Sequence, residues 1–193
     1  RLFKSAKTVN MQIPFSEIAL NEAQKKVIKL NNLTEAYIRP MCFYGSEGMG
    51  LRADNLQVHC MVAAWEWPSY MEPEAREKGI KVKLSSYKRQ VRNPVSSAKV
   101  NGNYVHSIVA LNEALAEGFD EALMLDAEGN VAEGSGENVF IVKDNLLITP
   151  DLEASLDGIT RRTILDLAKE LNIKYEIKKL KSEDVLKADE AFF

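Results

Sequence analysis

The sequence predicts a mixed α/β (α+β) protein, with a small α+β domain followed by a larger domain whose mixed sheet curls around a pocket. The chain has 193 residues, of which 46% are hydrophobic, so it can bury one good core or two small ones. Its first third alternates between helix-like and strand-like segments, which is the order expected of a small α+β unit. The remainder holds many short strand-like runs and few helical ones, which favours a mixed sheet.

The small domain is expected to cover residues 1–66. A glycine-rich loop at residues 45–50 joins its two strands. Residues 67–74 have the composition of a turn and no periodicity, so they are the expected linker to the second domain. The elements expected before this linker are the end of a helix at residues 1–9, a helix from an N-cap at Ser16 to residue 32, and strands at residues 36–43 and 56–65.

The larger domain is expected over residues 75–193. Its central helix is predicted at residues 105–117, where apolar residues recur at helical spacing and Gly118 ends the pattern. Asp144 and Asn145 are expected to close a hairpin between two strands. The other expected elements are a helical turn at residues 74–78, strands at 80–85, 122–125, 139–143, 146–149 and 175–180, a helix at 160–171 and a short helix at 182–186.

Charge and composition exclude several classes of partner. The formal net charge of −3 gives no electrostatic reason to expect nucleic acid or an anionic membrane as a partner. No apolar run approaches the length of a membrane span, and no signal peptide opens the sequence. The two cysteines, Cys42 and Cys60, lack metal-binding spacing, so we expect a cytoplasmic protein without a metal site, although one disulfide stays open.

Two residues, Lys99 and Glu133, are the candidates for chemistry. Lys99 lies in a loop of small residues just before a helix, and Glu133 lies on a glycine-rich turn just before an apolar strand. A lysine amine forms a Schiff base with an aldehyde once it loses a proton, and pyridoxal phosphate (PLP) uses such a lysine with an acid at its pyridine nitrogen. From residue type alone the ordinary alternatives remain, namely a solvated surface lysine and a plain turn between strands.

The segments around these residues are specific as a set. They read Ala98-Lys99-x-x-Gly102-Asn103-Tyr104 and Glu133-Gly134-Ser135-Gly136-Glu137-Asn138-x-Phe140. Both resemble signature segments of the class IV, fold-type IV PLP-dependent aminotransferases, and most closely those of the branched-chain amino acid aminotransferases. The resemblance implies PLP as cofactor and a pseudo-barrel second domain. It covers nearly the whole chain, because further matching segments occur in the family's order: Ala36–Pro40, Gly48–Gly50, Trp67-x-x-Tyr70 and Gly158–Arg161.

The resemblance implies a cofactor site in the second domain. Lys99 would hold PLP and move a proton as general acid and base, Tyr104 would bond the phenolate oxygen, and Glu133 would pair with the pyridine nitrogen. A helix N-terminus binds phosphate through its amides, although from the residues alone Thr160 is more often an ordinary N-cap. Asp157 stands where the family often has proline and places a negative charge near the proposed phosphate. The remaining implied cofactor-binding residues are Gly136, Glu137, Asn138, Leu156, Gly158, Ile159 and Thr160.

The implied substrate site lies in the first domain. Tyr37 and Arg39 alternate along a predicted strand and so point the same way, which from the pattern alone favours a solvent-facing pair. The resemblance instead implies that they line the substrate side-chain pocket, with Arg39 available to the distal carboxylate of glutamate. It also implies substrate contact for Tyr70 and, reaching into a neighbouring subunit's pocket, for Met49 and Leu51.

The implied reaction is transamination of branched-chain L-amino acids (leucine, isoleucine, valine) with 2-oxoglutarate, giving 2-oxo acids and L-glutamate. The implied assembly is a homodimer or a higher homo-oligomer. D-amino acid aminotransferase and aminodeoxychorismate lyase of the same class remain alternatives, as does an inactive PLP-binding or structural fragment. The chain does not begin with Met, starts inside what resembles a family helix and stops before a turn that binds substrate and phosphate, so we expect a fragment of a longer enzyme.

Overall fold

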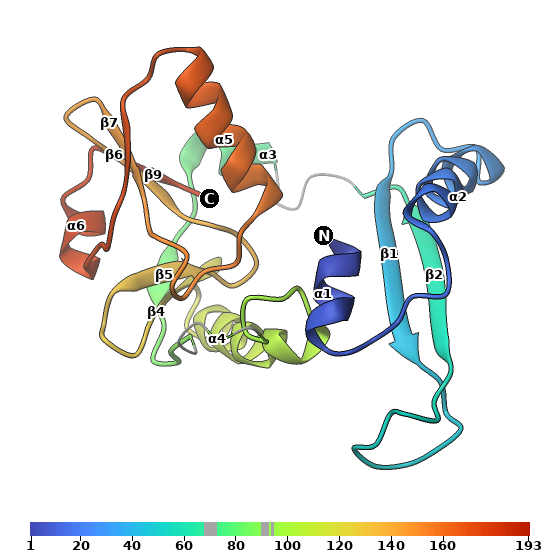
Figure 1. The fold of residues 1–193 in the computed structure, drawn as a ribbon. Coiled ribbons are helices and arrows are strands. Elements are labelled where there is room, and N and C mark those ends of the chain that lie inside the picture. Colours follow the sequence, from blue (N-terminus) through green and yellow to red (C-terminus); the bar gives the residue numbers. More distant parts are fainter. Residues whose placement is uncertain (68–72, 90–92, 94) are drawn as a thin grey trace. The chain divides into compact units, whose positions relative to one another are not determined.

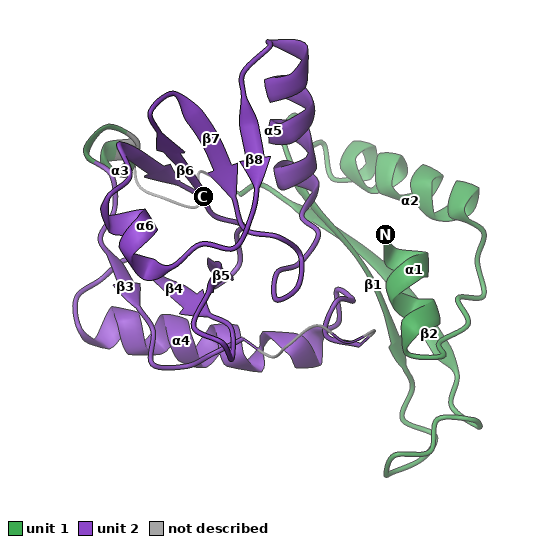
Figure 2. Cartoon of the chain, turned by 60° about the vertical axis from the view of Figure 1, so that its left-hand side comes forward, with its two compact units in different colours: residues 1–78 green, residues 79–193 purple. Residues whose placement is uncertain are grey.

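The structure is a computed structural model that describes residues 1–67, 73–89, 93 and 95–193. The chain divides into two compact units, Arg1–Lys78 and Gly79–Phe193, each of which we describe by itself (Figure 2). Helices and strands occur in both, which confirms the mixed α/β class. The expected linker at residues 67–74 includes residues 68–72, which lie outside the described residues.

The first unit is built on an antiparallel ribbon of two strands, β1 (Tyr37–Tyr44) and β2 (Val58–Trp65) (Figure 1). Helix α2 (Glu17–Leu30) packs against both strands, and helix α1 (Leu2–Thr8) packs against β1. The predicted N-cap of α2 is confirmed, because the hydroxyl of Ser16 accepts a hydrogen bond of 3.1 Å from the amide of Ala19. A short helix, α3 (Pro73–Lys78), ends the unit.

The second unit contains two sheets. Its elements are β3 (Val82–Leu84), a 3-10 turn η1 (Asn101–Tyr104), α4 (Val105–Ala116), β4 (Glu121–Leu125), β5 (Val131–Gly134), β6 (Phe140–Lys143), β7 (Leu146–Thr149), α5 (Ile159–Glu170), β8 (Tyr175–Ile177), α6 (Ser182–Leu186) and β9 (Glu190–Phe192). In the three-stranded sheet, of order β3-β4-β5, β3 runs parallel to β4 and β5 runs antiparallel to it. In the four-stranded sheet, of order β8-β7-β6-β9, only β7 and β8 are parallel, so both sheets are mixed as predicted.

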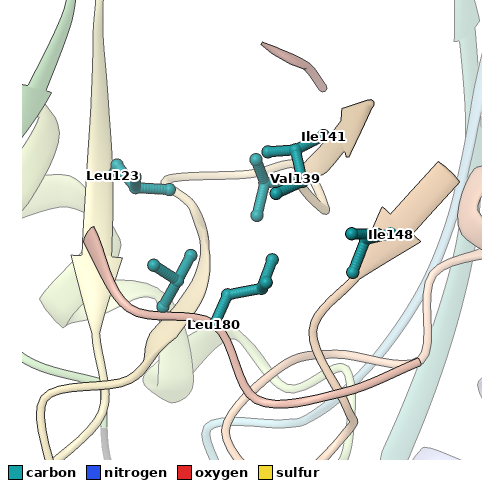
Figure 3. Packing of buried hydrophobic residues seen from close by; sticks show 6 residues of the cluster. Leu123, Val139, Ile141, Ile148 and Leu180 are labelled. Carbon is teal, nitrogen blue, oxygen red and sulfur yellow. The ribbon is translucent and has the colours of Figure 1, made fainter. Parts of the chain in front are cut away.

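Strand alternation explains how these sheets form a core. One cluster of buried side chains comes from both sheets and from the segment after β8, and Figure 3 shows these side chains converging; it consists of Leu123, Val131, Val139, Ile141, Ile148 and Leu180. Residues of opposite parity point away from this cluster. Met124 on β4 packs with Ala110 and Ala114 of α4, and Phe140 on β6 packs with Ala168 of α5. Each sheet therefore has one helix on its outer face.

The main differences between the structure and the sequence prediction concern four elements. Glu133 lies within β5, a buried strand, and the predicted turn is confined to the residues after it. The run Val131–Gly134 was not predicted as a strand, because Glu and Gly are uncommon in β-strands. Strand β9 and turn η1 were also not predicted, and α5 begins one residue earlier than expected, with Gly158 as its N-cap in place of Thr160.

Candidate active site

The lysine and tyrosine of the first motif lie in direct contact. The Nζ of Lys99 donates a hydrogen bond of 2.6 Å to the Oη of Tyr104 and lies 5.0 Å from the centre of its ring. Lys99 is exposed and Tyr104 is half-buried at the end of η1, where α4 begins. The side-chain amide of Asn103 connects the end of the motif to the segment before Lys99 by donating to the carbonyl oxygens of Val95 and Ala98, at 2.8 and 2.9 Å. The motif therefore presents one amine and one hydroxyl on a braced loop.

The carboxylate of Glu133 is buried and already has partners within the protein. Its side chain is 8% exposed, and Oε1 lies 2.6 Å from a guanidinium nitrogen of Arg89, which is itself 12% exposed. Its other oxygen accepts a hydrogen bond of 2.9 Å from the amide of Leu156. Burial raises the pKa of Glu133, while Arg89, the Leu156 amide and the charge of Lys99 act in the opposite direction. The positive charge of Arg89 thus offsets part of the free-energy cost of burying the charged carboxylate of Glu133.

Arg89 is the functional candidate that sequence reasoning missed. It lies in the irregular basic segment before Lys99, where a single arginine has no distinguishing pattern. Its guanidinium also donates a 3.4 Å hydrogen bond to the carbonyl of Asn103, so it joins the lysine motif to the glutamate motif. Beside it is a polar cavity of about 50 Å³, lined in part by Asn103, His106 and Ser155, with room for water molecules. No local sequence signal indicates Arg89, because its role depends on burial and on a partner that is distant in the sequence.

Asn138 connects the glutamate motif to the loop before α5. Its amide nitrogen donates to the carbonyl of Leu156 at 2.9 Å and lies 3.3 Å from the carboxylate of Glu133. A Cβ added to Gly158 would collide with the side-chain oxygen of Asn138, so only glycine lets the two loops approach this closely. Three predicted cofactor residues, Asn138, Leu156 and Gly158, are therefore brought together with Glu133.

The N-terminus of α5 lies at the surface of its unit. Gly158 caps this helix without a side-chain hydrogen bond, and both Ile159 and Thr160 are exposed. These features suit a site for an anion such as phosphate. The unfavourable charge of Asp157 is neutralised, because the guanidinium of Arg162 binds its carboxylate through two nitrogens.

Glu137 lies beside a second buried carboxylate, Glu121. Glu121 is 1% exposed, and its oxygens accept hydrogen bonds from the amide and hydroxyl of Ser135, at 3.2 and 3.0 Å. Burial, together with the charge and a side-chain hydrogen bond of Glu121, raises the pKa of Glu137 to about 7. These contacts support the turn after β5, in which Gly136 is exposed. Neither residue type nor spacing indicated Glu121.

The predicted substrate residues in the first unit form an aromatic and cationic cluster. The guanidinium of Arg39 lies 5.2 Å from the ring of Tyr37 and 5.4 Å from that of Trp65, and donates a 3.4 Å hydrogen bond to the Tyr37 hydroxyl. Trp67 contacts both Tyr37 and Trp65. The shared strand face predicted for Tyr37 and Arg39 is thus observed.

The structure says less about the other predicted substrate residues. Met49 and Leu51 are fully exposed in the loop between β1 and β2. Tyr70 lies outside the described residues. Within the part of the chain that the structure describes, no group of three or more His, Cys, Asp or Glu side chains is arranged to hold a metal ion. Among these same residues, no helix is both long and apolar enough to cross a membrane.

Comparison with known proteins gives one consistent family. The model of the class IV amino-transferase family matches residues 1–193. The chain is 55% identical to the branched-chain-amino-acid aminotransferase of Pseudomonas aeruginosa over 194 aligned positions, which include the whole chain but only 63% of that relative. The chain thus spans less than two thirds of the length of the curated relatives that it matches.

Solved structures agree. The crystal structure of the Escherichia coli branched-chain amino acid aminotransferase matches with a TM-score of 0.95 at 41% identity, over 98% of this chain and 64% of that one. The branched-chain aminotransferase of the thermophilic archaeon Thermoproteus uzoniensis, solved with norvaline, matches with a TM-score of 0.92 at 37% identity, over 100% and 64% of the two chains. These matches confirm the predicted fold class, and the chain belongs to the class IV aminotransferase family.

Proposed function

We propose that the protein catalyses PLP-dependent transamination of branched-chain L-amino acids with 2-oxoglutarate, giving 2-oxo acids and L-glutamate. The observation that carries this proposal is the pairing of the Lys99 amine with the Tyr104 hydroxyl in the same unit as the buried carboxylate of Glu133. The charge of Lys99 lowers the pKa of Glu133, which opposes the effect of burial. The choice of branched-chain substrates rests on the relatives, which are named for that activity.

The residues present fit PLP in three respects. Lys99 offers an amine for the aldehyde, and Glu133 offers a buried anion for the protonated pyridine nitrogen. The amides at the start of α5, after Gly158, offer a site for the phosphate, with Leu156 placed beside them to pack on the ring. Bound PLP supplies an aldehyde that takes up the substrate amine and a ring that accepts electrons from its Cα.

The chain's own residues would then control protons and charge. The Lys99 amine would act as the general base that takes the proton from the substrate Cα and as the general acid that gives the proton up again. Tyr104 would hold the lysine amine and the neighbouring phenolate oxygen by hydrogen bonds. Glu133 would keep the ring nitrogen protonated, because an ionised carboxylate favours a cation beside it.

Tyr37 and Arg39 are proposed to line the substrate pocket, with Tyr70 as a further contact. The guanidinium of Arg39, stacked on two aromatic rings, can bind the distal carboxylate of glutamate. Met49 and Leu51, exposed in their loop, are proposed to reach the pocket of a second subunit in a homodimer or higher homo-oligomer. We also propose that the protein acts in the cytoplasm.

The test is an assay of L-glutamate formation from L-leucine and 2-oxoglutarate with added PLP. We expect turnover by the wild type, none by Lys99→Ala, and a lower rate with a changed pH profile for Tyr104→Phe. Turnover of D-alanine in preference to L-leucine would show a D-amino acid aminotransferase instead. Release of pyruvate from aminodeoxychorismate without an amino acceptor would show the lyase. PLP binding without any turnover would contradict catalysis by this chain.

A further inference from the structure

The two cysteines face each other across the ribbon of the first unit. Cys42 on β1 is the direct partner of Cys60 on β2, and their sulfur atoms lie 3.1 Å apart. Directly opposed residues of an antiparallel pair have Cα atoms about 4.5 or 5.5 Å apart, and both values are within the range that a disulfide spans. The sulfurs need to approach only to about 2 Å, which rotation of the side chains can provide.

We propose that Cys42 and Cys60 are an oxidation site that closes to an intramolecular disulfide on reaction with a small disulfide such as oxidised glutathione. This proposal does not depend on the proposed enzymatic function. Both thiols are free and half-buried. They occupy the strand face opposite to Tyr37 and Arg39, because strand residues of opposite parity point to opposite faces. A disulfide would therefore fix the ribbon without occupying the face proposed for the substrate.

The reaction requires two exchange steps. In the first, the Cys60 thiolate attacks the small disulfide, which forms a mixed disulfide and releases one small thiol. In the second, the Cys42 thiolate attacks the sulfur of Cys60, which forms the protein disulfide and releases the second small thiol. Two protein thiols are oxidised and one small disulfide is reduced to two thiols, so atoms and electrons balance.

The raised pKa of Cys42 favours Cys60 as the first of the two thiols to attack. Burial and the adjacent sulfur of Cys60 raise the pKa of Cys42 to about 12, which makes Cys42 a poor first nucleophile at neutral pH. Once Cys60 carries the mixed disulfide, it has no thiolate that could repel the Cys42 anion or accept a hydrogen bond from the Cys42 thiol. That part of the pKa increase then disappears, and the second attack is intramolecular at close range.

The test uses the wild type and the variants Cys42→Ser and Cys60→Ser, each treated with oxidised glutathione and analysed by intact mass and thiol titration. The wild type should lose both thiols and about 2 Da without an adduct, and a non-reducing peptide map should link residues 42 and 60. Cys42→Ser should accumulate the glutathione adduct on Cys60, because the second thiol is missing. Cys60→Ser should react more slowly, and its difference from Cys42→Ser tests the assigned order.

Stability provides a second measurement that does not depend on how the variants fold. The oxidised wild type should melt at a higher temperature than the reduced wild type, and a reducing agent should reverse the shift. Retention of both thiols in the wild type, under conditions that oxidise the same chain unfolded in urea, would overturn the proposal. So would a wild type that stops at the mixed disulfide, or one whose cysteines pair only between two chains.

Discussion

The buried ion pair of Arg89 and Glu133 gives a prediction whose size can be worked out. Arg89→Met keeps most of the side-chain volume and removes the charge that lies 2.6 Å from the carboxylate. With charge centres about 4 Å apart and an effective dielectric constant of about 20, the lost attraction is about 4 kcal/mol. Removing one partner of a buried pair costs about 3–5 kcal/mol, because the other charge stays buried. We expect Arg89→Met to lower the free energy of unfolding by that amount at pH 8.

The pH dependence of this loss has a definite sign. Burial already raises the pKa of Glu133, and loss of Arg89 removes the principal opposing effect, so the pKa rises further. Below the ordinary value of 4.5, the carboxyl is protonated in both the folded and the unfolded variant, and the loss is small. The deficit relative to the wild type grows once the pH passes the raised pKa of Glu133 in the folded wild type, because the wild-type carboxyl then ionises while that of the variant stays protonated.

The measurement is urea denaturation from pH 4.5 to 8, together with hydrogen exchange of the Leu156 amide, which donates to Glu133. The control is Lys143→Met, which removes a 2.8 Å pair with Asp189 whose members are 44% and 50% exposed and should change stability little at any pH. The double variant Arg89→Met, Glu133→Gln should lose much less stability than the sum of the losses in the two single variants. Additive losses, or an Arg89→Met deficit that does not vary with pH, would refute the assigned role of the pair.

Three further predictions concern the second unit. Because the raised pKa of Glu137 makes its ionisation unfavourable in the folded state, the wild type should lose stability as the pH rises from 4.5 toward 7. Glu137→Gln should remove this loss, which denaturation at several pH values measures. Gly158→Ala should lower the free energy of unfolding by about 1–3 kcal/mol in thermal denaturation, because the added Cβ meets the side-chain amide of Asn138. Gly136→Ala, whose added Cβ has nothing within 4 Å, should lower it much less in the same assay. Met124→Ala should lower the free energy of unfolding by about 2–5 kcal/mol in urea denaturation, because this side chain is completely buried between α4 and the sheet. A smaller loss would mean that the neighbouring side chains move in to fill the cavity.

The elements that were predicted correctly have a clear pattern within their own stretch of sequence. The apolar spacing of residues 105–117 predicted α4, and Ser16 predicted the start of α2. Strand β5 was missed because its glutamate and glycine oppose strand formation, and only burial between neighbouring strands overrides that preference. Strand β9 was missed because it pairs with β6, a strand far earlier in the sequence, which no local pattern reveals.

The same distinction holds for the candidate site. The roles predicted for Lys99, Tyr104 and Glu133 come from a family resemblance, and the structure adds the contact between Lys99 and Tyr104. The partners Arg89 and Glu121 were not predicted. Their importance arises from burial and from neighbours distant in the sequence, since an ordinary arginine or glutamate carries no sign of either.

The most direct test of the proposed function is the visible absorption spectrum of the chain with added PLP, compared with that of Lys99→Ala. We predict a band from lysine-bound cofactor in the wild type, absent from the variant and lost on addition of L-leucine but not of D-alanine. Arg52→Ala, which removes an exposed arginine in the other unit, should leave the band unchanged. Identical spectra for the wild type and Lys99→Ala would contradict the assignment of Lys99 as the residue that holds the cofactor.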